Sequence, residues 1–158
     1  MEILFELKHC YTQMDEDYQN EFTIFEDGSL KVYQMETYCY EPKSKNINKS
    51  ANSDFLHAIK SLLLSHRKEI EEIPFTEIVP HWKFNMKVLD KQFSLIFFHR
   101  WHEINYDGTK NIRTNEDISK DFLIELICSI KEIIEQYYPN EINWTRFDTE
   151  HWFNNIER

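Results

Sequence analysis

Glycine is scarce in this chain, with only Gly28 and Gly108 among 158 residues. A P-loop and a Rossmann turn each need several closely spaced glycines, because the backbone must approach a phosphate or adopt a positive φ. A G-x-S-x-G nucleophile elbow has the same requirement. The sequence therefore excludes these phosphate-binding and hydrolase classes. Each glycine follows an aspartate, and such pairs indicate tight turns.

Cysteine is also sparse, and the three residues Cys10, Cys39 and Cys128 show no C-x-x-C spacing. An odd number of unclustered cysteines is typical of a compartment that keeps thiols reduced. The N-terminal residues show no basic leader followed by a long apolar stretch. The longest apolar stretches, such as residues 93–98, are too short to span a bilayer. We expect a cytoplasmic protein without membrane contact.

Basic residues are outnumbered, 18 against 28 acidic ones, which gives a formal charge of −10. Affinity for nucleic acid comes mainly from Lys and Arg that neutralise phosphates, so the charge argues against nucleic-acid binding. It suits a basic protein partner, because complementary fields speed and orient association. The alternative is that the acidic excess only keeps the chain in solution.

What the chain has in quantity is core material, with 41% apolar and 15% aromatic residues. The length predicts one domain, residues 1–158. Residues 2–11 alternate between apolar and polar and predict a strand. The ranges 22–25 and 30–40 flank Asp27-Gly28 and predict a hairpin. Residues 82–88 and 93–98 predict a second group of strands, and Asp107-Gly108 a further turn.

Two segments show the apolar spacing of amphipathic helices. The first runs over residues 55–73, after Asn52 or Ser53 as a cap. The second follows Thr114 and Asp117, which resemble a capping box, and runs to Tyr138. Between strands and helices lies a polar stretch, residues 41–52, which predicts a mobile loop. The tail beyond Trp144 is aromatic and predicts a short helix.

Strands that come as hairpins favour an α+β fold with an antiparallel sheet. The sequence predicts five to six strands in two hairpin groups, two long helices packed on one face and a short aromatic C-terminal segment. Tyr33, Met35, Tyr38 and Tyr40 crowd the third strand. We expect the aromatic tail or a partner chain to cover the second face.

The densest polar cluster is His99-Arg100-Trp101-His102-Glu103. Its order is not the H-E-x-x-H of a helical zinc site, and on a strand the two histidines point to opposite faces. We therefore predict no metal and no cofactor. His99, Trp101, His102 and Glu103 stay the candidate ligand site of an enzyme or small-molecule binder, since histidine titrates near neutrality.

Two acidic groups are the other candidates. The first is Asp15, Glu16, Asp17 and Glu21, which lack the glycine of a calcium loop and so do not predict a cation site. The second is Glu69, Glu71, Glu72 and Glu77, around the end of the first helix.

The favoured hypothesis is a small acidic binding protein. It would neutralise a basic toxin or nuclease, as immunity proteins and inhibitors do, with the acidic groups facing the partner. The alternative is the enzyme or ligand binder at residues 99–103, although no catalytic signature is present. The sequence leaves open whether the protein is a monomer or a homodimer.

Overall fold

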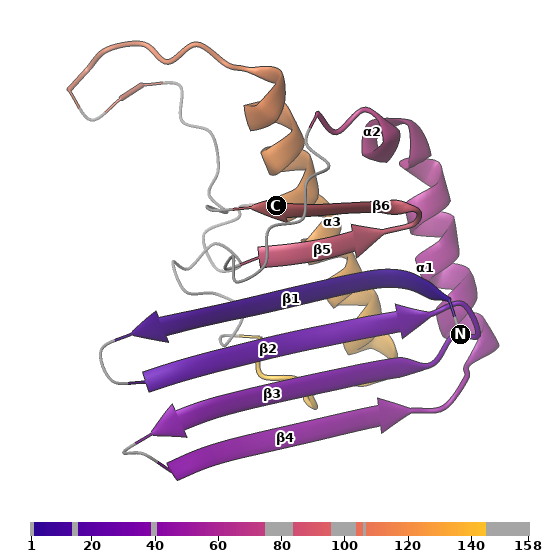
Figure 1. Cartoon of the computed structure of the whole chain (residues 1–158). Coiled ribbons are helices and arrows are strands. Elements are labelled where there is room, and N and C mark those ends of the chain that lie inside the picture. Colours follow the sequence, from indigo (N-terminus) through magenta and orange to yellow (C-terminus); the bar gives the residue numbers. More distant parts are fainter. Residues whose placement is uncertain are drawn as a thin grey trace.

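A computed structural model describes residues 2–13, 16–38, 41–74, 84–95, 104–105 and 107–144. Its strands form one six-stranded sheet in the order β4-β3-β2-β1-β5-β6, and every neighbouring pair is antiparallel (Figure 1). The strands are β1 Ile3–Gln13, β2 Glu16–Phe25, β3 Leu30–Tyr38, β4 Glu41–Lys49, β5 Phe84–Val88 and β6 Lys91–Leu95. The predicted α+β class with an antiparallel sheet is confirmed.

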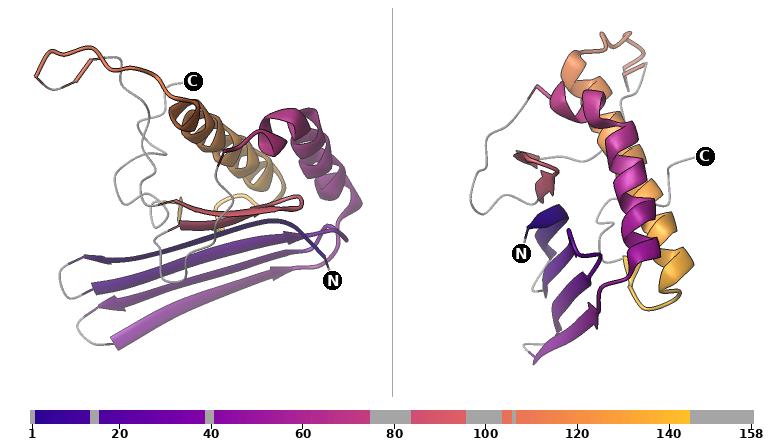
Figure 2. Two further views of the ribbon diagram at one scale, coloured as in Figure 1. Left: turned by 45° about the horizontal axis from the view of Figure 1, so that its top comes forward. Right: turned by 90° about the vertical axis from the view of Figure 1, so that its right-hand side faces the viewer.

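Within the described ranges, three helices accompany the sheet: α1 Ser53–Ser65, α2 Arg67–Glu71 and α3 Asn115–Tyr137. Helices α1 and α3 lie on the same side of the sheet, as the edge-on view in Figure 2 shows. The opposite side, called the open face here, is not covered by any of these three helices. Among the described helices, α1 and α3 therefore cover one face of the sheet, which lies in the core, and none covers the open face.

The core lies between the sheet and the helices. Strand alternation sends Leu7, Phe22 and Val32 to the helix side as cross-strand neighbours, and all three are fully buried. Helix α3 buries seven residues against the core: Leu123, Ile124, Leu126, Ile127, Cys128, Ile130 and Ile134. The buried Cys128 therefore acts as a small apolar side chain, as its place in the helix pattern predicts.

Both Asp-Gly pairs form the turns that the sequence predicts. In the β2–β3 hairpin, Oδ1 of Asp27 accepts hydrogen bonds from the backbone N and Oγ of Ser29, at 2.9 and 2.6 Å. Asp107 binds Thr109 in the same way, at 2.9 and 2.6 Å. These bonds lower the pKa of both carboxyl groups. Each following glycine has a positive φ, which glycine adopts without steric cost.

The first predicted long helix is in fact two helices. Asn52 caps α1 by accepting a hydrogen bond from the backbone N of Phe55 at 3.0 Å. At His66 the backbone leaves helical geometry, and the short α2 begins. The change places Ile70 in the core, while Lys91 of β6 donates to the carbonyl oxygen of Glu71 at 3.1 Å. The spacing of apolar residues shows which residues are buried. It does not show where a helix ends and a new one begins, so the sequence did not predict the break at His66.

The prediction of a mobile loop over 41–52 is wrong, because residues 41–49 form the edge strand β4, paired with β3 along its whole length. Ile47 is the one buried residue of this strand, so its sequence lacks the usual alternation. The strand is set by backbone pairing with β3. Its lysines and Pro42 suit an exposed sheet edge, where they discourage pairing with another chain.

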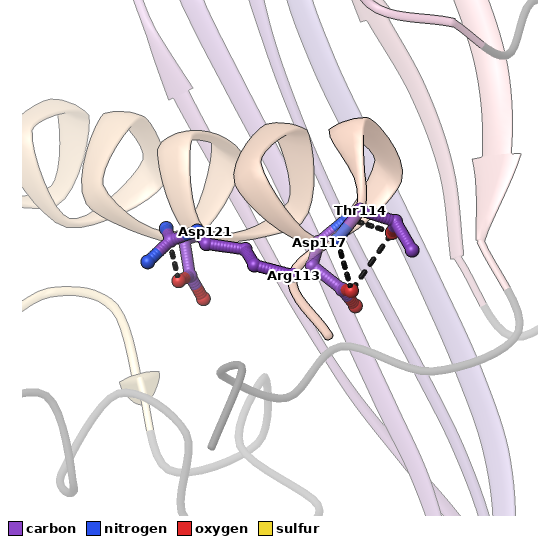
Figure 3. A network of polar contacts seen from close by, with 4 residues as sticks. All are labelled: Arg113, Thr114, Asp117 and Asp121. Carbon is purple, nitrogen blue, oxygen red and sulfur yellow. Dashed lines mark hydrogen bonds and ion pairs between the residues drawn. The ribbon is translucent and has the colours of Figure 1, made fainter. Parts of the chain in front are cut away.

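The capping box at the start of α3 is confirmed (Figure 3). Oγ1 of Thr114 accepts from the backbone N of Asp117 at 3.1 Å, and the Asp117 carboxylate accepts from the backbone N of Thr114 at 3.0 Å. The backbone and side-chain bonds from Thr114 lower the pKa of Asp117. Beside them, Arg113 forms an ion pair with Asp121 at 3.0 Å. Helix α3 is the longest helix described.

Replacing Thr114 with alanine is expected to destabilise the protein by about 1 kcal/mol at pH 7. The folded-state pKa of Asp117 is lowered, so the stability contributed by its carboxylate is present above the unfolded value and is lost as pH falls through the folded value. The effect of Thr114→Ala should therefore shrink in acid. Urea unfolding at pH 7 and pH 3 tests this, with Ser61→Ala on α1 as control. An effect that grows in acid contradicts the prediction.

Residues 145–158, which hold most of the predicted aromatic C-terminal segment, lie outside the described residues. Trp144, the last described residue, packs edge-on against Phe22 with ring centroids 5.9 Å apart. Among the described residues, no helix is long and apolar enough to cross a membrane.

Candidate functional site

The open face carries an acidic and aromatic patch on β2 and β3, defined here as Asp17, Glu21, Tyr33 and Met35. Glu21 lies directly opposite Tyr33 in the antiparallel register, and Met35 is the next outward residue along β3. Tyr33 and Met35 are half-buried, and Asp17 is exposed. Because strand residues alternate between faces, Asn20, Phe22 and Gln34, which flank these residues in sequence, are buried on the helix side. The patch therefore lies opposite the helices.

Polar neighbours position the carboxylate of Glu21. Nε2 of Gln19 donates to its Oε1 at 2.9 Å. Lys8 lies opposite Glu21 on β1, and its Nζ is 3.8 Å from a carboxylate oxygen of Glu6. The open face is therefore of mixed charge, with its carboxylates held beside lysines and amides.

Cys10 also lies on the open face, next to Lys8 and Glu21. Partial burial raises the pKa of its thiol, the charge of Glu21 adds to the rise, and Lys8 opposes it. A thiol with a raised pKa carries little thiolate at neutral pH, which is the reactive form. The environment of Cys10 therefore does not suit nucleophilic chemistry.

The described acidic residues of the second predicted group, Glu69, Glu71 and Glu72, lie on or beside α2 and away from the open face. Glu71 forms an ion pair with Arg67 at 3.1 Å, and Glu69 lies 3.7 Å from Nδ1 of His66. Glu72 is the exposed C-cap of α2. The structure therefore does not bring the two acidic groups together: Asp17 and Glu21 are on the open face, while Glu69, Glu71 and Glu72 are on or beside α2.

Several predicted site residues cannot be placed. Asp15 and Glu77 lie outside the described residues, as do His99, Trp101, His102 and Glu103 of the alternative ligand site. Glu16 is placed through its backbone alone, as the first residue of β2. Across the described ranges, no group of three or more His, Cys, Asp or Glu side chains could hold a metal ion.

A polar row that the sequence analysis missed crosses the helix-covered face. His9, Asn20, Gln34 and Lys45 are cross-strand neighbours on β1 to β4, and the first three are buried. Nε2 of Gln34 donates to Oδ1 of Asn20 at 3.1 Å and to the carbonyl oxygen of Asn143 at 2.9 Å. Its Oε1 accepts from the backbone N of Asn143 at 3.1 Å.

The same row, with β4, holds the segment that follows α3. Lys45 donates to the carbonyl oxygen of Glu141, and Lys49 forms an ion pair with its carboxylate at 2.6 Å. A cavity of about 150 Å³ lies beside this contact. One feature of the sequence could have predicted this row. Positions 9, 20 and 34 are polar although each lies on the core side of its strand. The row joins the sheet to the end of α3.

The described residues thus define an α+β protein with a six-stranded antiparallel sheet and helices against one face. Neither a protein-family model nor a curated protein nor a solved structure matches the chain. The candidate site therefore rests on the geometry of this molecule.

Proposed function

We propose that this chain is a small acidic binding protein that holds a basic protein partner, as immunity proteins and inhibitors of nuclease toxins do. The observation that carries the proposal is the acidic and aromatic patch on the open face. Tyrosine supplies large contact area at low entropic cost and is enriched among the residues that dominate binding energy. Carboxylates around it orient a basic surface during approach.

The charge of the whole chain supports the same partner. A net charge of −10 attracts a basic protein over a distance that salt shortens, so the association rate should fall as ionic strength rises. Glu69, Glu71 and Glu72 lie on or beside α2, away from the open face. In this proposal they contribute to the long-range field, and Asp17 and Glu21 contact the partner.

The enzyme hypothesis at residues 99–103 stays a prediction, because those residues lie outside the described ranges. Within the described ranges, no observation favours it over binding. The test of the binding proposal therefore concentrates on the open face.

Replacing Asp17 with Asn and Glu21 with Gln together is expected to slow association with the basic partner about tenfold at low salt. The partner to test first is a basic protein encoded next to this gene. Stopped-flow measurement at 50 and 300 mM salt gives the rates. The expected rate difference between variant and wild type shrinks at high salt, because screening weakens the same attraction.

The matched control replaces Glu125 and Glu132 with Gln on α3, where both side chains are exposed on the helix side. This control also removes two negative charges. It should change the association rate less than twofold, because its charges lie farther from the partner and are screened by salt. Equal slowing by both variants would show that only total charge matters. Absence of binding to any basic protein encoded beside the gene would contradict the function itself.

A further inference from the structure

The chain carries an exposed arm directly before α3, defined here as residues 104–105 and 107–113. Figures 1 and 2 show this arm projecting beyond the start of α3 and away from the sheet. It presents two large apolar side chains, since Ile104 is 62% exposed and Ile112 is 88% exposed. Isoleucine is among the residues most often buried in folded proteins, and exposed apolar groups that gather in one place mark contact surfaces.

Hydrogen bonds within the arm hold its shape. The backbone N of Asn105 donates to the carbonyl oxygen of Thr109 at 2.7 Å, and the backbone N of Gly108 donates to the carbonyl oxygen of Asn105 at 2.9 Å. At the base of the arm, Arg113 is fixed by its ion pair with Asp121 at 3.0 Å. The isoleucines are therefore presented by a backbone that is already formed, which lowers the entropic cost of binding.

The arm is basic, although the whole chain is acidic. Its charged residues are Asp107, Lys110 and Arg113, one acid and two bases, in a chain of net charge −10. Asp107 is engaged by Thr109 and Arg113 by Asp121. Lys110 pairs with Ile104 across the arm and is exposed. It forms no ion pair among the described residues, so its ammonium group is available to a carboxylate outside the arm.

A complementary surface lies where α1, α2 and α3 meet, and it is called the receiving surface here: His66, Glu69, Ile118 and Phe122. Ile118, near the start of α3, is 48% exposed. Phe122, one turn further, is half-buried, and its ring centroid lies 5.5 Å from that of His66. The exposed carboxylate of Glu69 lies 3.7 Å from Nδ1 of His66. Apolar side chains beside a carboxylate match the isoleucines and the lysine of the arm.

Within one chain, the arm and α2 lie on opposite sides of the start of α3 (Figure 1), and the second view in Figure 2 agrees. The arm therefore does not reach α2 of its own chain. A two-fold axis beside the start of α3 exchanges these two sides, so the arm of each copy faces the receiving surface of the other. Such closed two-fold symmetry is the commonest form of protein oligomer.

We propose that this chain forms a homodimer in which the arm of each copy packs on the receiving surface of the other. Each contact buries the two isoleucines of the arm against Ile118 and places Lys110 beside Glu69. A second copy is the occupant because the basic arm and the acidic surface that matches it belong to the same sequence. The contact does not use the acidic and aromatic patch of the open face, so it is independent of the proposed function.

Sedimentation equilibrium of the full chain tests the dimer. Ile112→Ser should raise the dissociation constant about a hundredfold, because burial of one isoleucine contributes about tenfold and the dimer contains the contact twice. Leu64→Ser is the matched control, since Leu64 is an apolar residue of the same size that is 51% exposed on α1. It should leave the constant unchanged. A wild-type chain that stays monomeric at about 100 µM, or equal constants for Ile112→Ser and wild type, would overturn the proposal.

An exchange of charges tests which surfaces meet. Lys110→Glu places two carboxylates together in each contact, and Glu69→Lys places two ammonium groups together. Each variant alone should dimerise at least about tenfold more weakly than wild type. In an equimolar mixture of the two variants, both contacts of a mixed dimer join opposite charges, so association should return to nearly the wild-type constant. A mixture that associates no more tightly than either variant alone would show that the arm does not meet the receiving surface.

Discussion

Replacing Gly28 with alanine is expected to lower the free energy of unfolding by about 3 kcal/mol. Two costs combine. Gly28 has a φ of 83°, where a Cβ is strained. That Cβ would also lie 2.5 Å from the carbonyl oxygen of Asn52 and 2.9 Å from Cβ of Leu56. The first of these atoms is backbone at the cap of α1, so relief requires moving the helix away from the hairpin.

Gly108→Ala is the matched control for this substitution. Gly108 also follows an aspartate in a turn and has a φ of 86°, but no atom of the described residues beyond its chain neighbours lies within 4 Å of its Cβ position. It should cost about 1 kcal/mol, from backbone conformation alone. Urea unfolding of both variants at pH 7 separates the conformational cost from the contact with α1. Equal losses would show that the contact is not made in solution.

Replacing Gln34 with leucine is expected to destabilise the protein by about 3 kcal/mol, because the three hydrogen bonds of its amide to Asn20 and Asn143 are lost at a buried position. Gln34 is 7% exposed. Its amide binds both the backbone N and the carbonyl oxygen of Asn143, and it also binds Asn20. Leucine has a similar volume and offers no hydrogen bonds. The loss of stability therefore measures the hydrogen bonds of the polar row and not the creation of a cavity.

Gln19→Leu provides the comparison on the other face of the sheet. Gln19 is half-buried and donates one side-chain hydrogen bond to Glu21, so the change should cost less than about 1 kcal/mol. Urea unfolding gives both stabilities. Hydrogen exchange at the Asn143 amide gives an independent readout, which should speed up in Gln34→Leu and stay unchanged in Gln19→Leu. Unchanged exchange in Gln34→Leu would contradict the role of the row.

Much of the fold could be predicted because it depends on local patterns. Alternation in β1 placed Phe5, Leu7 and His9 on one face, and all three are buried. The Asp-Gly pairs gave both turns, because the aspartate binds the backbone two residues ahead and glycine accepts positive φ. Thr114 and Asp117 predicted where α3 begins, because their hydrogen bonds join residues that are only three positions apart in the sequence.

The failures concern elements set by contacts that the pattern of apolar residues does not record. Strand β4 has one buried side chain, and its backbone bonds to β3 leave no trace in the pattern of apolar residues. The break at His66 lets α2 meet Lys91 of β6, a contact between residues about twenty positions apart. Residue propensities and apolar periodicity describe each segment without its neighbours in space. Neither could therefore predict β4 or the break at His66.

The candidate site shows the same division. The sequence by itself determined that the chain is strongly acidic, that it lacks the glycines of phosphate-binding loops, and that acidic residues concentrate at 15–21 and 69–77. Only the tertiary structure decided that Asp17 and Glu21 face away from the helices, while Glu69 and Glu71 lie on α2, away from the open face. It also decided that Ile104 and Ile112 are exposed. Net charge is a property of composition. The face on which each charged side chain lies depends on strand pairing and on packing between residues that are far apart in the chain.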